Sequence, residues 1–372
     1  MYGGTLTDLL IGDPLTSRQN HAAAAVLDFM CYKFGRVDQT TLRVGYAFAI
    51  AAMSAILMGC GTDRSSGEPP ESAAARGAGA ASQSPYVGQP LPGLTPERFA
   101  PGLVSTDAIE LNGVFSPDLD EFYFTRVVGG VDTMHQINFA DGRWGSAREL
   151  LIFPNHTRAE AADMVLSRDG EELFFLAGFP RAAPAEKQNY DIWWSRRSGD
   201  GWSEAELVPA PISTPGYEYY PSFGPDGSLY INSNRDGTGA IYRAARLADR
   251  TFAPPVKVGH PFLPLDGDLS FAPDGSFIVV SAQRPRIGGS FRNDLFISFR
   301  RSNGTYADFV SLDDTINTPA HEWCPMVTPD GRYLFFSRRF GAYDTQGWDG
   351  TTDGDVFWVD VHALDKYRSA TP

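Results

Sequence analysis

The sequence predicts an all-β fold: a β-propeller of five blades, each a four-stranded antiparallel sheet, with the ring closed by an N-terminal outer strand. Three observations support this. One turn phrase recurs five times at intervals of 48 to 57 residues, each copy lies between strand-like segments, and the last repeat lacks a fourth strand. The composition agrees, because 13% aromatic residues, 38 glycines and 27 prolines suit short strands joined by tight turns.

The recurring phrase is a hairpin turn built on proline, aspartate and glycine. Proline presets the first turn dihedral, aspartate accepts hydrogen bonds from the turn backbone, and glycine takes the positive φ that closes the hairpin. The five copies are Ser116-Pro117-Asp118, Ser167-Arg168-Asp169-Gly170, Gly224-Pro225-Asp226-Gly227, Ala272-Pro273-Asp274-Gly275 and Thr328-Pro329-Asp330-Gly331. Arg168 replaces proline and Leu119 replaces glycine, and we expect these departures to weaken single turns without changing the number of blades.

Each repeat continues with two more strand-like segments. The third strand carries patterns such as Asp191-Ile-Trp-Trp, Asp294-Leu-Phe-Ile and Asp355-Val-Phe-Trp, and the fourth opens with an aromatic residue. These aromatics are Trp144, Trp202, Phe252 and Tyr306. Four strands in about 50 residues match one propeller blade, whose faces are buried only when neighbouring blades pack on it.

The fifth repeat ends after its third strand, and only a short tail follows it. The segment Phe99-Ala-Pro-Gly-Leu-Val resembles Phe252-Ala-Pro-Pro-Val-Lys-Val of the outer-strand position. We therefore expect the N-terminal segment to supply the missing outer strand, which would also protect an unpaired sheet edge. A sixth blade would need a degenerate repeat between residues 85 and 110, a stretch too short to hold one.

The repeat resembles the TolB-like, WD-type propeller repeats with a Pro-Asp-Gly turn that occur in many exported bacterial proteins. The resemblance covers roughly residues 86 to 365. It implies the propeller fold but no single function, because such propellers serve as docking platforms, ligand binders and gating domains of oligopeptidases.

The N-terminal region reads as an export signal. Val44 to Met58 is uncharged, follows Arg43, and is too short to span a membrane comfortably. The Gly59-Cys60 pair after it resembles the bacterial lipobox, which implies acylation of Cys60. We expect an upstream extension and signal peptide at residues 1–59, a flexible tether at 60–85 and the propeller at 86–368, with translation starting at Met1 or at Met30.

Charge and cysteine content narrow the classes of partner. A formal net charge of −14 argues against nucleic acid, whose binding depends on clustered Lys and Arg. The three cysteines fit neither a disulfide framework nor a CxxC metal site. The ligand should therefore be an envelope protein, a glycan or a small molecule. Gly61 rather than Asp follows Cys60, and resemblance to the sorting pattern of enterobacterial lipoproteins implies an exported protein that is lipid-anchored at the outer membrane and faces the periplasm.

A recurring acid is the most informative polar pattern. Glu110, Glu218, Asp266 and Glu322 each lie seven residues before the second position of a turn phrase, and Glu160 is one place off in the second repeat. This position begins the innermost strand, so we expect the acids to surround one mouth of the channel. They could bind Ca²⁺ or a basic group, or each acid could cap backbone N–H groups. No other cofactor is predicted.

Two long insertions offer a second binding candidate. They run from Gly178 to Tyr190 and from Phe340 to Gly354. The second contains Tyr343, Asp344, Trp348 and Asp349, a mixture that suits a sugar ring or a cation, although a mobile polar loop would have the same composition.

The sequence offers little for catalysis. It has no G-x-S-x-G elbow, and His321-Glu322 lacks the second histidine of a zinc helix. We expect a membrane-tethered binding or scaffolding propeller. The alternative is a carbohydrate-active hydrolase with two carboxylates near the channel mouth.

Overall fold

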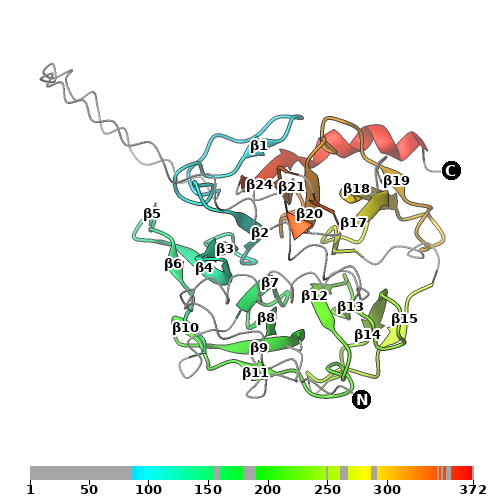
Figure 1. Ribbon diagram of the computed structural model, residues 1–372, viewed down its shortest axis with the longest axis horizontal. Helices are drawn as coiled ribbons and strands as arrows, with labels where there is room; N and C mark the ends of the chain where they lie inside the picture. Colours follow the sequence, from blue (N-terminus) through cyan, green and yellow to red (C-terminus); the bar gives the residue numbers. More distant parts are fainter. Residues whose placement is uncertain are drawn as a thin grey trace, which may run out of the picture. The chain divides into compact units, whose positions relative to one another are not determined.

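The computed structural model describes residues 86–153, 160–178, 190–248, 250–259, 267–285, 291–341, 343–344, 347–348 and 353–370. Five antiparallel sheets follow one another along this part of the chain and are arranged around a common axis (Figure 1). The prediction of a five-bladed, all-β propeller is confirmed.

In blades 1 to 4 the strands run outward from the axis in chain order. Blade 1 contains β2 (Glu110–Phe115), β3 (Glu121–Val128), β4 (Val131–Ala140), β5 (Arg143–Trp144) and β6 (Arg148–Glu149). Blade 2 contains β7 (Glu160–Leu166), β8 (Glu172–Gly178), β9 (Tyr190–Ser198), β10 (Gly201–Trp202) and β11 (Glu206–Leu207). Blade 3 contains β12 (Glu218–Phe223), β13 (Leu229–Ser233), β14 (Ala240–Ala244) and β15 (Val256–Lys257).

Blade 4 contains β16 (Leu269–Phe271), β17 (Phe277–Pro285), β18 (Phe291–Phe299) and β19 (Val310–Ser311). Blade 5 contains β20 (His321–Val327), β21 (Tyr333–Arg339), β24 (Gly354–Asp360) and β1 (Glu97–Arg98). A separate pair, β22 (Tyr343–Asp344) and β23 (Gly347–Trp348), lies within the last insertion. In blade 2 every residue of the second strand, β8, is buried, because neighbouring blades cover both faces of the sheet.

The ring is closed by the N-terminal segment, as the sequence predicts. Strand β1 pairs antiparallel with β24, with Glu97 opposite Trp358 and Arg98 opposite Phe357. Phe99 extends the ladder by donating its N–H to the carbonyl of Val356 at 2.8 Å. Segments far apart in the sequence thus share one sheet, in which β1 covers the outer edge of β24.

The predicted turns are present, with the departures accommodated. Gly170, Gly227, Gly275 and Gly331 all have φ between +72° and +76°. In blade 1, Leu119 takes the same place at φ +60°, a conformation that costs more for a residue with a side chain. Five blades form in spite of this substitution.

The chain ends in an element that the sequence analysis missed. The 3₁₀ helix η2 (Val361–Ala370) packs Ala363, Leu364 and Tyr367 against the core between blades 4 and 5. Its Tyr367 hydroxyl accepts a hydrogen bond from the N–H of Asp313 at 2.7 Å. Within the described residues, no helix has the length and apolarity needed to cross a membrane.

The five innermost strands, β2, β7, β12, β16 and β20, surround the axis. Neighbouring members are in contact around the whole ring. In four of them the pairing with the second strand shifts register at one place, after Leu111, Ala162, Tyr219 and Trp323. Such a β-bulge redirects the side chain that it contains. The shared position of these bulges defines the candidate site described next.

Candidate functional site

Three of the recurring acids, Glu110, Glu218 and Glu322, are fully buried and form hydrogen bonds and ion pairs within their own blades. Glu110 is fully buried and accepts hydrogen bonds from the N–H and the hydroxyl of Thr106, at 3.0 and 2.5 Å. Its second partner is Arg126 of the adjacent strand β3, whose Nε lies 2.7 Å from Glu110 Oε1. The carboxylate therefore caps its own entry loop and neutralises a half-buried arginine.

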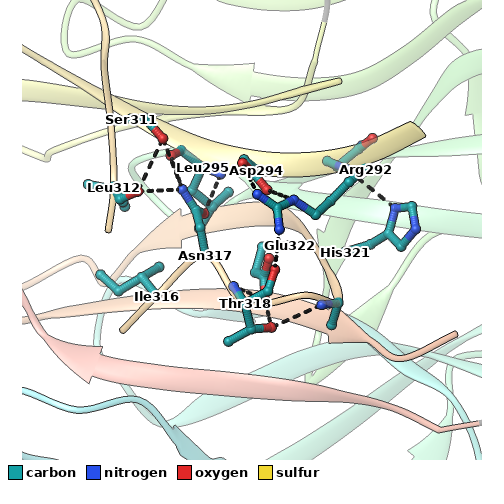
Figure 2. Close-up of polar contacts among 12 residues, drawn as sticks. Arg292, Asp294, Leu295, Ser311, Leu312, Ile316, Asn317, Thr318, His321 and Glu322 are labelled. Carbon is teal, nitrogen blue, oxygen red and sulfur yellow. Dashed lines mark hydrogen bonds and ion pairs between the residues drawn. The ribbon is translucent and has the colours of Figure 1, made fainter. Parts of the chain in front are cut away.

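Glu322 repeats this arrangement in blade 5. It accepts from the N–H and hydroxyl of Thr318, at 3.1 and 2.6 Å, and Arg338 Nε lies 2.9 Å away. Figure 2 shows Glu322 next to Thr318, whose hydroxyl also accepts the N–H of Ala320. Burial raises the pKa of the Glu322 carboxyl above its usual value, although Thr318 and Arg338 act in the opposite direction.

Blade 3 has the same unit, with Thr214, Glu218 and Arg235. The threonine N–H and hydroxyl donate to Glu218 at 3.0 and 2.7 Å, and Arg235 Nη2 lies 3.4 Å from the carboxylate. We call these three Thr-Glu-Arg sets the capping units. The sequence analysis proposed backbone capping as one use of the acids but missed both partners, although the threonine always stands four residues before the glutamate.

The other predicted binding residues are only partly described. Glu160 accepts a hydrogen bond from the Tyr190 hydroxyl. Asp266 and Asp349 lie outside the described residues, as do the side chains of Tyr343, Asp344 and Trp348. Cys60 and the region before residue 86 also lie outside. Binding by the insertion and lipidation of Cys60 therefore stay predictions.

Asn317 and Arg292 position the entry loop of blade 5. The Asn317 amide bridges blade 4 and this loop, accepting the N–H of Leu295 at 2.7 Å and donating to the carbonyls of Leu295 and Leu312 (Figure 2). Arg292 donates to the carbonyl of Thr318 at 3.0 Å and pairs with the buried Asp294. Thr318 is thereby held where its N–H and hydroxyl donate to Glu322.

A second polar layer lies two residues further along the innermost strands. Every blade contributes one side chain with a hydrogen-bonding or thiol group, and we call this set the axial ring. Its members are Asn112, Asp163, Tyr220, Asp268 and Cys324. Four of them are at least 95% buried, whereas Asp163 is half-buried. The sequence analysis missed the ring because its five residue types differ.

The axial ring is connected across the channel. Tyr220 of blade 3 donates its hydroxyl to the carbonyl of Pro325 in blade 5 at 2.9 Å. Cys324 Sγ donates to Asp163 of blade 2 at 3.9 Å, and the Cys324 N–H donates to Asp268 of blade 4 at 3.1 Å. Asn112 of blade 1 accepts the N–H of Met164 at 2.7 Å. These bonds join all five blades at one depth.

The backbone of the ring is strained. Asn112, Asp163, Tyr220 and Cys324 have φ between +47° and +54°, the left-handed region. Asparagine and aspartate tolerate it, but a tyrosine or a cysteine adopts it only when the surrounding structure enforces it. Backbone strain of this kind is concentrated at functional sites in many proteins, and here it is concentrated at the axis.

The ring combines two carboxylates with neutral hydrogen-bonding groups. Burial, together with nearby Cys324 and Asp268, raises the pKa of Tyr220 well above its usual value, so its hydroxyl stays a neutral donor. No lysine or arginine belongs to the ring, and Arg126, Arg235 and Arg338 are already paired in the capping units. Among the described residues, no group of three or more His, Cys, Asp and Glu side chains is arranged to hold a metal ion.

Comparison with known proteins identifies no family. No family model and no curated protein matches the chain. Similar solved structures include TolB from Acinetobacter baumannii, at 14% identity and a TM-score of 0.40 over 68% of this chain, which spans only 57% of that TolB. They also include an alpha-L-arabinofuranosidase from Podospora anserina, at 11% identity and a TM-score of 0.41 over 73% of this chain and 98% of that one. A puromycin hydrolase matches at 16% identity and a TM-score of 0.37 over 62% of this chain and 34% of that one. At these values the assignment of the fold rests on the strand pairing of the chain itself.

Proposed function

We propose that the protein is an exported, lipid-tethered binding propeller that receives a basic group of its ligand at the axial ring. The observation that carries the proposal is the ring itself: all five blades present a polar side chain at one axial position, and two of these are the carboxylates Asp163 and Asp268. A carboxylate in a largely buried site attracts a positively charged group, and Asp163 is the carboxylate of the ring that is exposed in part.

The shape of the site favours a narrow cationic group. The side chain of Tyr220 reaches from blade 3 to blade 5 and so fills the channel at the depth of the ring. Asp163 is the only member of the ring that is half-buried. A lysine ammonium or an arginine guanidinium on a flexible stem could reach Asp163, whereas a bulky group could not. Hydrogen bonds from such a group to a carboxylate are charge-assisted and correspondingly strong.

Binding of single amino-acid derivatives tests this proposal. With the full-length protein in detergent, titration calorimetry should detect Nα-acetyl-arginine amide or Nα-acetyl-lysine amide and should not detect Nα-acetyl-citrulline amide, the neutral analogue of arginine. Asp163→Asn should weaken binding by about tenfold or more. Asp118→Asn, which removes the same charge from the exposed hairpin turn of blade 1, should leave binding unchanged. Equal heats for the arginine and citrulline probes would refute a basic ligand.

The membrane tether is a separate part of the proposal. It rests on the apolar run that ends in Gly59-Cys60. Radiolabelled palmitate should enter the wild-type chain and should not enter Cys60→Ala, because the labelled lipid would be attached at Cys60. Equal labelling of the two proteins would exclude lipidation at Cys60.

One observation favours a hydrolase as the second candidate. Asp163 and Asp268 both accept a hydrogen bond from Cys324, so two carboxylates lie close to one residue. Glycosidases use two carboxyl groups about 5 to 9.5 Å apart. In that case the protein should hydrolyse at least one of a set of nitrophenyl glycosides, and Asp163→Asn and Asp268→Asn should each abolish the activity. Activity that survives both substitutions would exclude this pair.

A further inference from the structure

The hairpin turns form a packed ring at the end of the channel opposite the capping units. A methyl group added at Gly170 would lie 3.3 Å from Pro117 of the preceding turn, and one added at Gly275 would lie 2.9 Å from Pro225. The proline of one turn therefore packs against the glycine of the next blade. We call this end of the propeller the turn face and the opposite end the loop face.

Arg168 breaks the pattern of this ring. It stands where the other four turns have proline, and its side chain extends from blade 2 over two other blades. Its Nη1 donates to the carbonyl of Pro225 in blade 3, and its Nη2 donates to the carbonyl of Pro273 in blade 4. A guanidinium can bridge two carbonyls in this way because its donors point in different, fixed directions.

The residues along the axis can be ordered by their position in the innermost strands. The capping glutamates begin these strands, the axial ring follows two residues later, and Met326 lies two residues beyond Cys324, close to the turns. Met326 is half-buried and packs against three hydrophobic clusters, which together contain residues of blades 1, 2, 3 and 5. A side chain that reaches the cores of four blades must lie at the axis.

We infer that Arg168 is a plug that closes the turn-face mouth of the axial channel, so that the axial ring is open to ligands from the loop face only. The substitution of proline by arginine in one blade of five then has a use, because one long side chain can cover a channel surrounded by short turns. The inference is independent of which ligand the ring binds. It gives the propeller one binding face, at the end where the second strands finish and the third strands begin.

Oxidation of Met326 tests the plug, since methionine reacts with peroxides according to its exposure. Full-length protein in detergent would be treated with tert-butyl hydroperoxide, and methionine sulfoxide would be quantified by peptide mass spectrometry. In Arg168→Ala the rate at Met326 should rise by about fivefold or more. Met134 and Met164, which are 3% and 1% exposed, should stay unreactive and report that the fold is intact.

Two further variants make the result decisive. Arg168→Pro restores the turn found in the other blades and should give the same increase at Met326 without loss of stability. Arg332→Ala removes an exposed arginine from the turn of blade 5 and should leave the Met326 rate unchanged. A rate at Met326 within about twofold of the wild type in both Arg168 variants would overturn the inference. If all three methionines react faster in Arg168→Ala, the fold of that variant has loosened, and the rate at Met326 in Arg168→Pro then tests the inference.

Discussion

Replacing Arg338 by alanine is expected to lower the free energy of unfolding by about 3 to 5 kcal/mol at neutral pH. The substitution leaves the fully buried Glu322 without its cation, and it also removes a hydrogen bond to the carbonyl of Ile316. Urea unfolding, followed by tryptophan fluorescence, measures the effect. Arg332→Ala, at an exposed turn position, should change stability by less than about 0.5 kcal/mol.

The pH dependence of this variant has a definite sign. Burial already raises the pKa of Glu322, and loss of Arg338 should raise it further. A carboxyl whose pKa is higher in the folded than in the unfolded protein stabilises the fold while protonated, and this contribution is lost as pH rises through the folded pKa. The deficit of Arg338→Ala should therefore shrink as pH falls from 7 toward 4.5. Glu322→Gln in the same chain should recover part of the stability at neutral pH, and no recovery would contradict an unpaired charge as the cause.

Replacing Phe99 by alanine is the second substitution for which we expect a large effect. Phe99 is fully buried, and its ring centroid lies 4.8 Å from those of Phe122 and Phe335 and 5.2 Å from that of Trp358. The ring thus packs between blade 1 and blade 5 at the junction that closes the propeller. Deletion of a buried phenylalanine ring costs about 3 to 5 kcal/mol.

The same urea experiment measures the Phe99 effect against a neighbouring control. Pro101→Ala changes an exposed residue of the same segment and should have little effect. A loss below about 1 kcal/mol for Phe99→Ala would mean that the junction contributes little to stability.

The blades and their closure were predictable because each blade repeats the same short sequence pattern. The Pro-Asp-Gly turn recurs since only a few residue types satisfy its dihedral angles, and a missing fourth strand at one end implies a donor at the other. The capping units also left a signal, a threonine four residues before three of the acids. Threonine is not a charged residue, so its spacing from the acids stands out only when the hydrogen-bond donors of each acid are sought.

The axial ring and the plug could not be predicted in the same way. Asn112, Tyr220 and Cys324 share a backbone position, not a chemical type, and only the bulge brings them to one depth. Arg168 reads as a weakened turn in the sequence, because its partners Pro225 and Pro273 lie 57 and 105 residues further along the chain. Helix η2 follows the last repeat, so no second copy exists with which to compare it.

The axial ring exists only if five blades are held in one closed ring. Native-state hydrogen exchange tests this closure most directly. The amide of Phe99, bonded to Val356, would be followed at increasing urea together with amides of the second strands, such as those of Val279 and Phe335. If the N-terminal strand locks the ring, all three amides should exchange through the same global opening, with one free energy and one dependence on urea. Exchange of Phe99 through a separate, low-energy opening, while the second strands stay protected, would contradict closure by this strand.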